Sequence, residues 1–300
     1  MEDRGEDVLG GALGAPSRLY FGVEFCQHLM PTAADVAEAR AWAEERGWGF
    51  TMLTPYVTDA FLPPVDEQLA ALAPGTEVVV EDWGVLRRAR AAGHLPVLGR
   101  GLHRLTRDPR LPDVGPEHLR GDDPPSSWQQ GSLGSRRFRA FLKRSGVGRV
   151  HLDVPLQGLS PLPEGVPVAV HLPYGMIASG RICMVSSWGK PASQRFVPPR
   201  HCDAPCRRFT VALRAPWSRR DGGAESVPLV SDGSFIPLSH VLNRRRNALP
   251  EAEADPAPRF LQKGNTHFYR LEGDALEQAA AWAQESPVVD RVVLEPDLPM

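Results

Sequence analysis

Long apolar runs are absent from this 300-residue chain, and no stretch reaches the roughly 18 apolar residues of a membrane-spanning helix. Residues 1–17 have neither the apolar core of a signal peptide nor the basic character of a transit peptide, so we expect a disordered N-terminus in a cytoplasmic protein. An excess of one charge is also lacking, because 34 basic and 36 acidic residues give a formal net charge of −2. Neither nucleic acid nor an anionic membrane is therefore an expected partner.

Several short catalytic and cofactor motifs are missing. No G-x-G-x-x-G follows the first expected strand, which removes the main signal for a dinucleotide site. Neither the H-E-x-x-H of zinc peptidases nor the G-x-S-x-G of serine hydrolases is present. The residues alone thus give no positive support for peptidase chemistry.

What the chain does contain is a regular alternation of strand-like and helix-like segments. The expected strands are 18–25, 49–54, 77–80, 95–98, 149–154, 166–172 and 290–294, with less regular extended pieces at 229–236 and 260–269. The expected helices are 33–46, capped by Thr32, then 65–72, 82–92, 135–144 and 274–284. This order is typical of α/β proteins with a parallel sheet.

The length suits a single (β/α)8 TIM-barrel-like domain over residues 18–300. Loop insertions are expected near 107–134, 214–226 and 247–258, where proline or polar residues interrupt the alternation. A doubly wound open sheet is the alternative architecture.

Cysteine is scarce, with only four in the chain: Cys26, Cys183, Cys202 and Cys206. Cys202 and Cys206 form a C-x3-C pair, and Cys26 directly follows the first expected strand. The carboxyl ends of barrel strands face one mouth, so all four thiols could meet there. Four readings are open: buried small side chains, a structural zinc site, redox thiols, or an iron–sulfur cluster. Zinc sites usually have two short cysteine pairs, and this chain has one, which favours the cluster.

Several longer motifs resemble the collagenase-like "peptidase" family of unassigned catalytic type, family U thirty-two. They are LYFGVEFC (19–26), VVVEDWGVLRRA (78–89), VLGRGLHRLTRDPR (97–110), GRVHLDVPLQGL (148–159), HLPYGMIASGRIC (171–183), CDAPC (202–206) and KGNTHFY (263–269). The order of HLPY, RIC and C-x3-C is the most specific part. The resemblance covers about residues 19–296.

The resemblance implies a barrel-type fold and a 4Fe–4S cluster held by Cys26, Cys183, Cys202 and Cys206. It also implies a role in oxygen-independent hydroxylation, since the short members act in anaerobic ubiquinone synthesis as a pair of paralogues. A paralogous protein partner is therefore expected. Other branches hydroxylate a base in RNA, with prephenate supplying the oxygen, but this chain lacks the long C-terminal extension of many such members.

Five other residues are candidates for the site. Glu24, His171 and Tyr174 are catalytic candidates, because a carboxylate, an imidazole and a phenol near the cysteines can move protons. Arg100 and Arg181 are candidates for binding a carboxylate-bearing small molecule. Each has an ordinary structural alternative, as a salt-bridge partner, a packing residue or a cap.

Three functions follow from these candidates. The first is a 4Fe–4S protein that takes part in oxygen-independent hydroxylation or a related redox modification of a small molecule. The second is a non-catalytic iron–sulfur accessory subunit of a partner enzyme. The third is a collagenase-like peptidase or other hydrolase, which rests on the family label alone.

Overall fold

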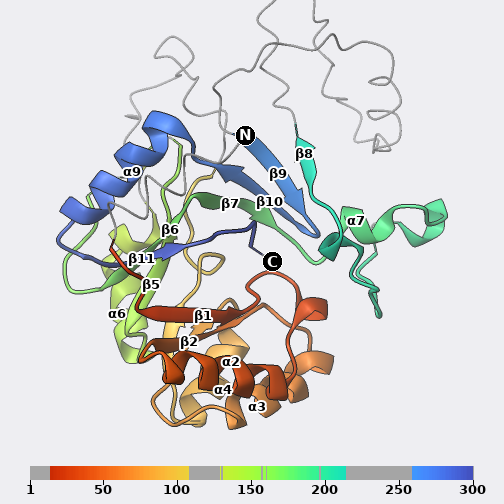
Figure 1. The fold of residues 1–300 in the computed structure, drawn as a ribbon, viewed down its shortest axis with the longest axis horizontal. Helices are drawn as coiled ribbons and strands as arrows, with labels where there is room; N and C mark the ends of the chain where they lie inside the picture. Colours follow the sequence, from red (N-terminus) through yellow and green to blue (C-terminus); the bar gives the residue numbers. More distant parts are fainter. Residues whose placement is uncertain are drawn as a thin grey trace, which may run out of the picture.

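The computed structural model describes residues 14–107, 129, 131–156, 158–159, 161–195, 197–213 and 259–299. Their main feature is a seven-stranded parallel sheet with the order β1-β2-β3-β4-β5-β6-β11. Its strands are β1 (Arg18–Gly22), β2 (Gly49–Thr54), β3 (Glu77–Val80), β4 (Leu95–Leu98), β5 (Arg149–Asp153), β6 (Val168–Leu172) and β11 (Val289–Leu294). The sheet curls into a nearly closed, barrel-like form flanked by helices (Figure 1).

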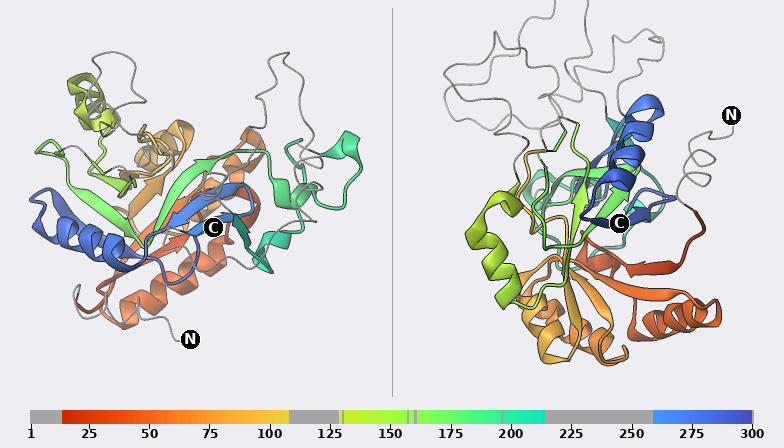
Figure 2. Two further views of the ribbon diagram at one scale, coloured as in Figure 1. Left: turned by 90° about the horizontal axis from the view of Figure 1, so that it is seen from above. Right: turned by 90° about the vertical axis from the view of Figure 1, so that its left-hand side faces the viewer.

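Helices follow most of these strands. They are α2 (Ala33–Glu45), α3 (Leu62–Ala70), α4 (Trp83–Ala91), α6 (Arg136–Arg144), α7 (Met184–Ser187) and α9 (Gly273–Glu285). α2, α3 and α4 lie together outside β1–β4, and α9 lies on the far side near β6 and β11 (Figures 1 and 2). None of the helices in the described ranges has both the length and the apolar character that crossing a membrane requires.

A second sheet lies above the first. It is antiparallel, with the order β7-β10-β9-β8, and contains β7 (Tyr174–Ser179), β8 (Val211–Leu213), β9 (Arg259–Lys263) and β10 (Thr266–Arg270). β7 begins two residues after β6 ends, so the chain passes directly from the parallel sheet into this one. The short 3-10 helices η1 (Gln27–Leu29), η2 (Asp59–Phe61), η5 (Ser132–Gly134), η6 (Ala192–Gln194) and η7 (Pro205–Arg207) shape the connections.

The structure confirms the alternation of strands and helices and corrects it in two places. The segment 260–269, expected as one extended piece, is a β9–β10 hairpin whose turn is Gly264-Asn265; Gly264 has φ +57°, a left-handed conformation that glycine adopts readily. β7 was not expected. The described residues supply seven parallel strands where the sequence predicted eight units, and the predictions at 1–13, 108–128, 214–226, 229–236 and 247–258 lie outside the described residues.

Two apolar cores support the barrel-like sheet. One packs β2 and β3 against α2, α3 and α4, and the other packs β4, β5 and β6 against α6, α9 and the hairpin. β5 and β6 are almost entirely buried, as expected for central strands of a parallel sheet covered on both faces.

Glu77, on β3, connects strands from opposite sides of the sheet. Its carboxylate accepts hydrogen bonds from Arg149 on β5 and Arg291 on β11, and it lies 3.3 Å from Arg18 on β1. Burial alone would raise the pKa of Glu77, but hydrogen bonding and charge from Arg291, with Arg149 and Arg18, lower it to about 2. This carboxylate therefore ties together the first, middle and last strands at their amino ends.

We expect Glu77→Gln to lower the free energy of unfolding by about 2–3 kcal/mol at pH 7, because three arginines lose a charged acceptor. The folded pKa lies below the value of about 4.3 for an unfolded glutamate, so the contribution is present above pH 4 and lost as pH falls toward 2. Urea unfolding measured from pH 7 to pH 3 should show the unfolding free energies of the parent and of Glu77→Gln converging as the pH falls.

Glu44→Gln, which breaks an exposed pair with Arg40, is the control and should cost about 0.3–0.5 kcal/mol. A difference in unfolding free energy between the parent and Glu77→Gln that does not change with pH would contradict this account.

Candidate functional site

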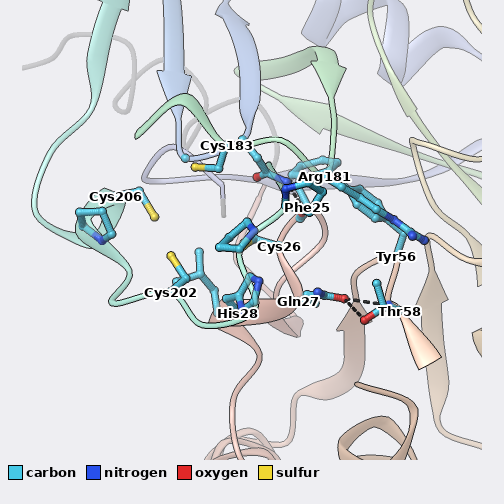
Figure 3. Close-up of a pocket in the computed structure, with 16 residues that line it drawn as sticks. Phe25, Cys26, Gln27, His28, Tyr56, Thr58, Arg181, Cys183, Cys202 and Cys206 are labelled. Atoms are coloured by element: carbon cyan, nitrogen blue, oxygen red, sulfur yellow. Dashed lines mark hydrogen bonds between the residues drawn. The ribbon is translucent and has the colours of Figure 1, made fainter. Parts of the chain in front are cut away.

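All four cysteines line one pocket at the carboxyl end of the barrel-like sheet (Figure 3). Cys26 follows β1 and begins η1, Cys183 follows β7 and begins α7, and Cys202 and Cys206 flank and occupy η7. In Figure 3 the sulfurs of Cys183, Cys202 and Cys206 are turned toward one common space. Cys26, Cys183 and Cys206 also pack in one apolar cluster. The structure thus brings together thiols from three distant parts of the sequence.

Backbone N–H groups point at two of these sulfurs. The N–H of Ser186 donates to Cys183 Sγ at 3.3 Å, and the backbone of His28 donates to Cys26. At Cys206, Gly264 comes so close that a Cβ added there would lie 3.4 Å from the sulfur. These donors stabilise thiolates and are a usual means of tuning iron–sulfur sites.

Two of the four thiols, Cys26 and Cys206, ionise less readily than a free cysteine. Burial, with smaller contributions from the neighbouring Cys206, Cys183 and Cys202, raises the pKa of Cys26 to about 11. Burial also raises the pKa of Cys206, with smaller contributions from Cys183 and Cys202.

The opposite wall of the pocket is polar. It is formed by Gln27, Tyr56, Thr58, Arg181 and Asn265. The Asn265 amide donates to Tyr56 Oη at 2.8 Å and to the carbonyls of Phe25 and Gly180 at 2.7 Å each. Tyr56 is thereby held in place beside the cysteines, and burial raises its pKa.

Tyr56 and Asn265 are site residues that the sequence reasoning missed. Tyr56 follows the carboxyl end of β2, as Cys26 follows that of β1, so the same rule about strand ends applies to both. Asn265 lies in the turn of the unexpected hairpin and could not be placed without it.

Arg181 is the one predicted polar residue that lines the cysteine pocket. It is exposed, and its printed hydrogen bond is a 3.3 Å contact to the carbonyl of Val57. A guanidinium with so few protein partners has N–H groups left to bind a carboxylate.

Arg100 lies elsewhere, in the interior of the barrel-like sheet, with its side chain fully buried. It donates to both carboxylate oxygens of Glu24, to Asp153 Oδ1 at 3.0 Å and to Glu295 Oε1 at 2.8 Å. Phe25 covers the guanidinium at 5.2 Å from its ring centroid and also lines the cysteine pocket. The structure therefore separates Arg100 and Glu24 from the pocket by one aromatic ring.

His171 continues this buried network. Its Nδ1 lies 2.7 Å from Glu295 Oε1, and its Nε2 lies 2.8 Å from His151 Nδ1. Burial lowers the pKa of His171 to about 4 and holds the pKa of His151 well below its usual value, so both rings are neutral at pH 7. Burial raises the pKa of Glu295 to about 8.

Tyr174 is also buried, packed with Phe25, Met176 and Phe268, while its carbonyl accepts a hydrogen bond from Arg100 at 3.3 Å. Its ring lies 5.7 Å from the Arg270 guanidinium. Tyr174 therefore belongs to the layer between the network and the pocket, and the catalytic roles of Glu24, His171 and Tyr174 stay predictions.

Glu24, His151 and His171 each place one ligand atom within 4.8 Å of the others, a spacing that could hold a metal ion. However, Arg100 already neutralises Glu24, and the two imidazoles bond to each other. A second cation here would lie beside a buried guanidinium. The printed hydrogen bonds hold Glu24, His171 and His151 Nδ1 in place, whereas His151 Nε2 has no partner among the described residues.

Comparison with known proteins adds no relative: no family model, no curated protein and no solved structure matches this chain. The resemblance to family U thirty-two therefore remains an expectation from the motifs.

The two arginines should respond differently to substitution. Arg100→Leu leaves buried carboxylates without their cation and should lower the free energy of unfolding by about 3–5 kcal/mol. Arg181→Leu removes an exposed side chain and should change it by less than about 0.5 kcal/mol. Urea unfolding at pH 7 measures both. Equal effects would mean that the buried network does not hold the fold together.

Proposed function

We propose that this chain binds a 4Fe–4S cluster through Cys26, Cys183, Cys202 and Cys206. The observation that carries the proposal is one pocket lined by all four thiols of the chain. Sulfur is the ligand for iron–sulfur clusters, and a cluster is wide enough to be held from separate loops. When bound, it supplies one-electron redox chemistry. We also propose that the chain has the (β/α)8-type fold predicted from the sequence and that it is related to family U thirty-two.

The reaction that fits best is an oxygen-independent hydroxylation, or a related redox modification, of a small carboxylate. Arg181 would bind the carboxylate, since it lines the pocket opposite the cysteines with N–H groups to spare. Tyr56, held by Asn265 and by Ser179 at 3.0 Å, would hold a proton at its Oη beside the bound molecule. Phe25 excludes the buried network from direct contact with that molecule.

A second candidate is an iron–sulfur subunit that serves a partner enzyme, including a paralogue. Its support is the segment 182–209, which supplies three of the four cysteines and carries the exposed side chains of Ile182, Trp188, Val197 and Phe209. A pocket lined by an exposed arginine favours the first candidate, and exposed apolar side chains next to the cysteines favour the second.

The cluster proposal predicts iron and acid-labile sulfide in protein produced and purified without oxygen. Cys26→Ser, Cys183→Ser, Cys202→Ser and Cys206→Ser should each lose most of the iron, because three thiolates hold the group less tightly than four. Tyr56→Phe is the matched control, since it changes the same pocket without removing a sulfur, and it should keep the iron. Recovery of zinc in place of iron would replace this proposal with a structural metal site.

The substrate proposal predicts a loss of carboxylate binding in Arg181→Ala. With prephenate as the probe, calorimetry should show about a tenfold weaker Kd, because one exposed charge-assisted anchor is removed. Arg144→Ala, an exposed arginine at the end of α6, is the control and should bind as the parent does. Iron content must be equal in the three proteins. The same Kd in the parent and Arg181→Ala would exclude Arg181 as the anchor.

A further inference from the structure

Two aromatic side chains stack on the surface beside the cysteine pocket. Trp188, just after α7, and Phe209, just after η7, have ring centroids 5.3 Å apart and nearly parallel planes. Both remain open to solvent, with Trp188 49% and Phe209 37% exposed. Stacked aromatics that stay exposed are costly for a monomer and typical of protein interfaces.

Exposed apolar residues are concentrated in this segment. Of the nine large hydrophobic residues exposed in the described part of the chain, four lie within residues 182–209: Ile182, Trp188, Val197 and Phe209. The other five are spread over the remaining described residues. We call these four residues, with the basic residues named next, the basic-aromatic face.

The same 28 residues are strongly basic. They contain Lys190, Arg195, Arg200, Arg207 and Arg208, against one acidic residue, Asp203. The rest of the chain holds 29 basic and 35 acidic residues, so positive charge is gathered here in an otherwise acidic protein. A local basic surface of this kind steers an anionic partner to one place.

The segment that carries the face also forms the outer wall of the pocket. Cys183, Cys202 and Cys206 lie within it, and Pro198 and Pro199 line the pocket next to Val197. Figure 1 shows the segment projecting from the body of the protein at the ends of β7 and β8. A protein bound to this face would sit directly against the cysteine pocket.

We propose that the basic-aromatic face is the docking surface for a small acidic one-electron carrier protein. The inference rests on the proposed cluster, which would take up the electron. In the step, the reduced carrier loses one electron and the cluster gains one, and no bond forms or breaks. The stacked Trp188 and Phe209 supply the apolar centre of the contact, and the basic residues of the same segment supply positive charge.

Charge and geometry disfavour two other occupants. A second copy of this chain would bring the same basic surface against this one, and like charges across an interface are costly. Single-stranded nucleic acid needs separate aromatic faces on which successive bases stack, whereas here one ring covers the other. An acidic protein satisfies both the charge and the apolar centre.

The test uses the cluster-loaded protein with two probes, an acidic 2Fe–2S ferredoxin and an acidic flavodoxin. At least one should bind with a Kd that weakens steadily as salt rises, measured by calorimetry, and should reduce the cluster in stopped-flow absorbance. Lys190→Glu with Arg208→Glu reverses two charges without touching a residue adjacent to a cysteine, and should slow reduction at least tenfold. Trp188→Ala, which leaves the charges intact, should weaken binding by a similar factor.

The control is Arg136→Glu with Arg137→Glu, an exposed basic pair at the start of α6, which should behave as the parent within twofold. Binding by neither probe, or equal effects of the two double variants, would overturn the docking proposal. Tighter binding of a single-stranded oligonucleotide than of either carrier would also overturn it. If the purified protein contains no iron, the cluster proposal fails. The salt dependence of carrier binding then still tests whether the basic-aromatic face is a docking surface.

Discussion

The buried ion pairs of Arg100 are the interaction on which the rest of this structure depends. One guanidinium, fully enclosed, bonds carboxylates that follow β1, end β5 and follow β11. These strands lie at the two edges and in the interior of a seven-stranded sheet, so one side chain connects strands that are not neighbours in the sheet. A buried charge is expensive unless every partner is present, and the fold therefore requires Glu24, Asp153 and Glu295 together.

This constraint also decides where chemistry can take place. The interior is filled by buried polar groups and covered by Phe25, so the space next to the cysteines lies outside the barrel-like sheet. Its walls come from strand ends, from the hairpin turn at Asn265 and from the 182–209 segment. In barrel-type proteins the packed strands commonly support the fold, while the loops at their carboxyl ends carry the binding residues.

The local part of this structure could be predicted from the sequence. The capping box of Thr32 and Asp35 and the strands at 49–54 and 77–80 follow from short-range patterns, and the structure confirms them. Pairings across the barrel could not be predicted, because no periodicity links Arg100 to Glu295, nearly two hundred positions away. For the same reason Arg100 looked like a ligand for substrate. The local sequence pattern of an arginine after a strand is the same whether its side chain faces solvent or three carboxylates.

The spacing of the cysteines has a consequence for biosynthesis. Cys206 is made 180 residues after Cys26, yet both belong to one pocket. A nascent chain that stops before Cys206 cannot present the complete set of thiols, and its exposed Cys26 is open to oxidation or to the wrong metal in the meantime. Any group that needs all four sulfurs must therefore be delivered after translation has passed this point, to a chain that is already largely folded.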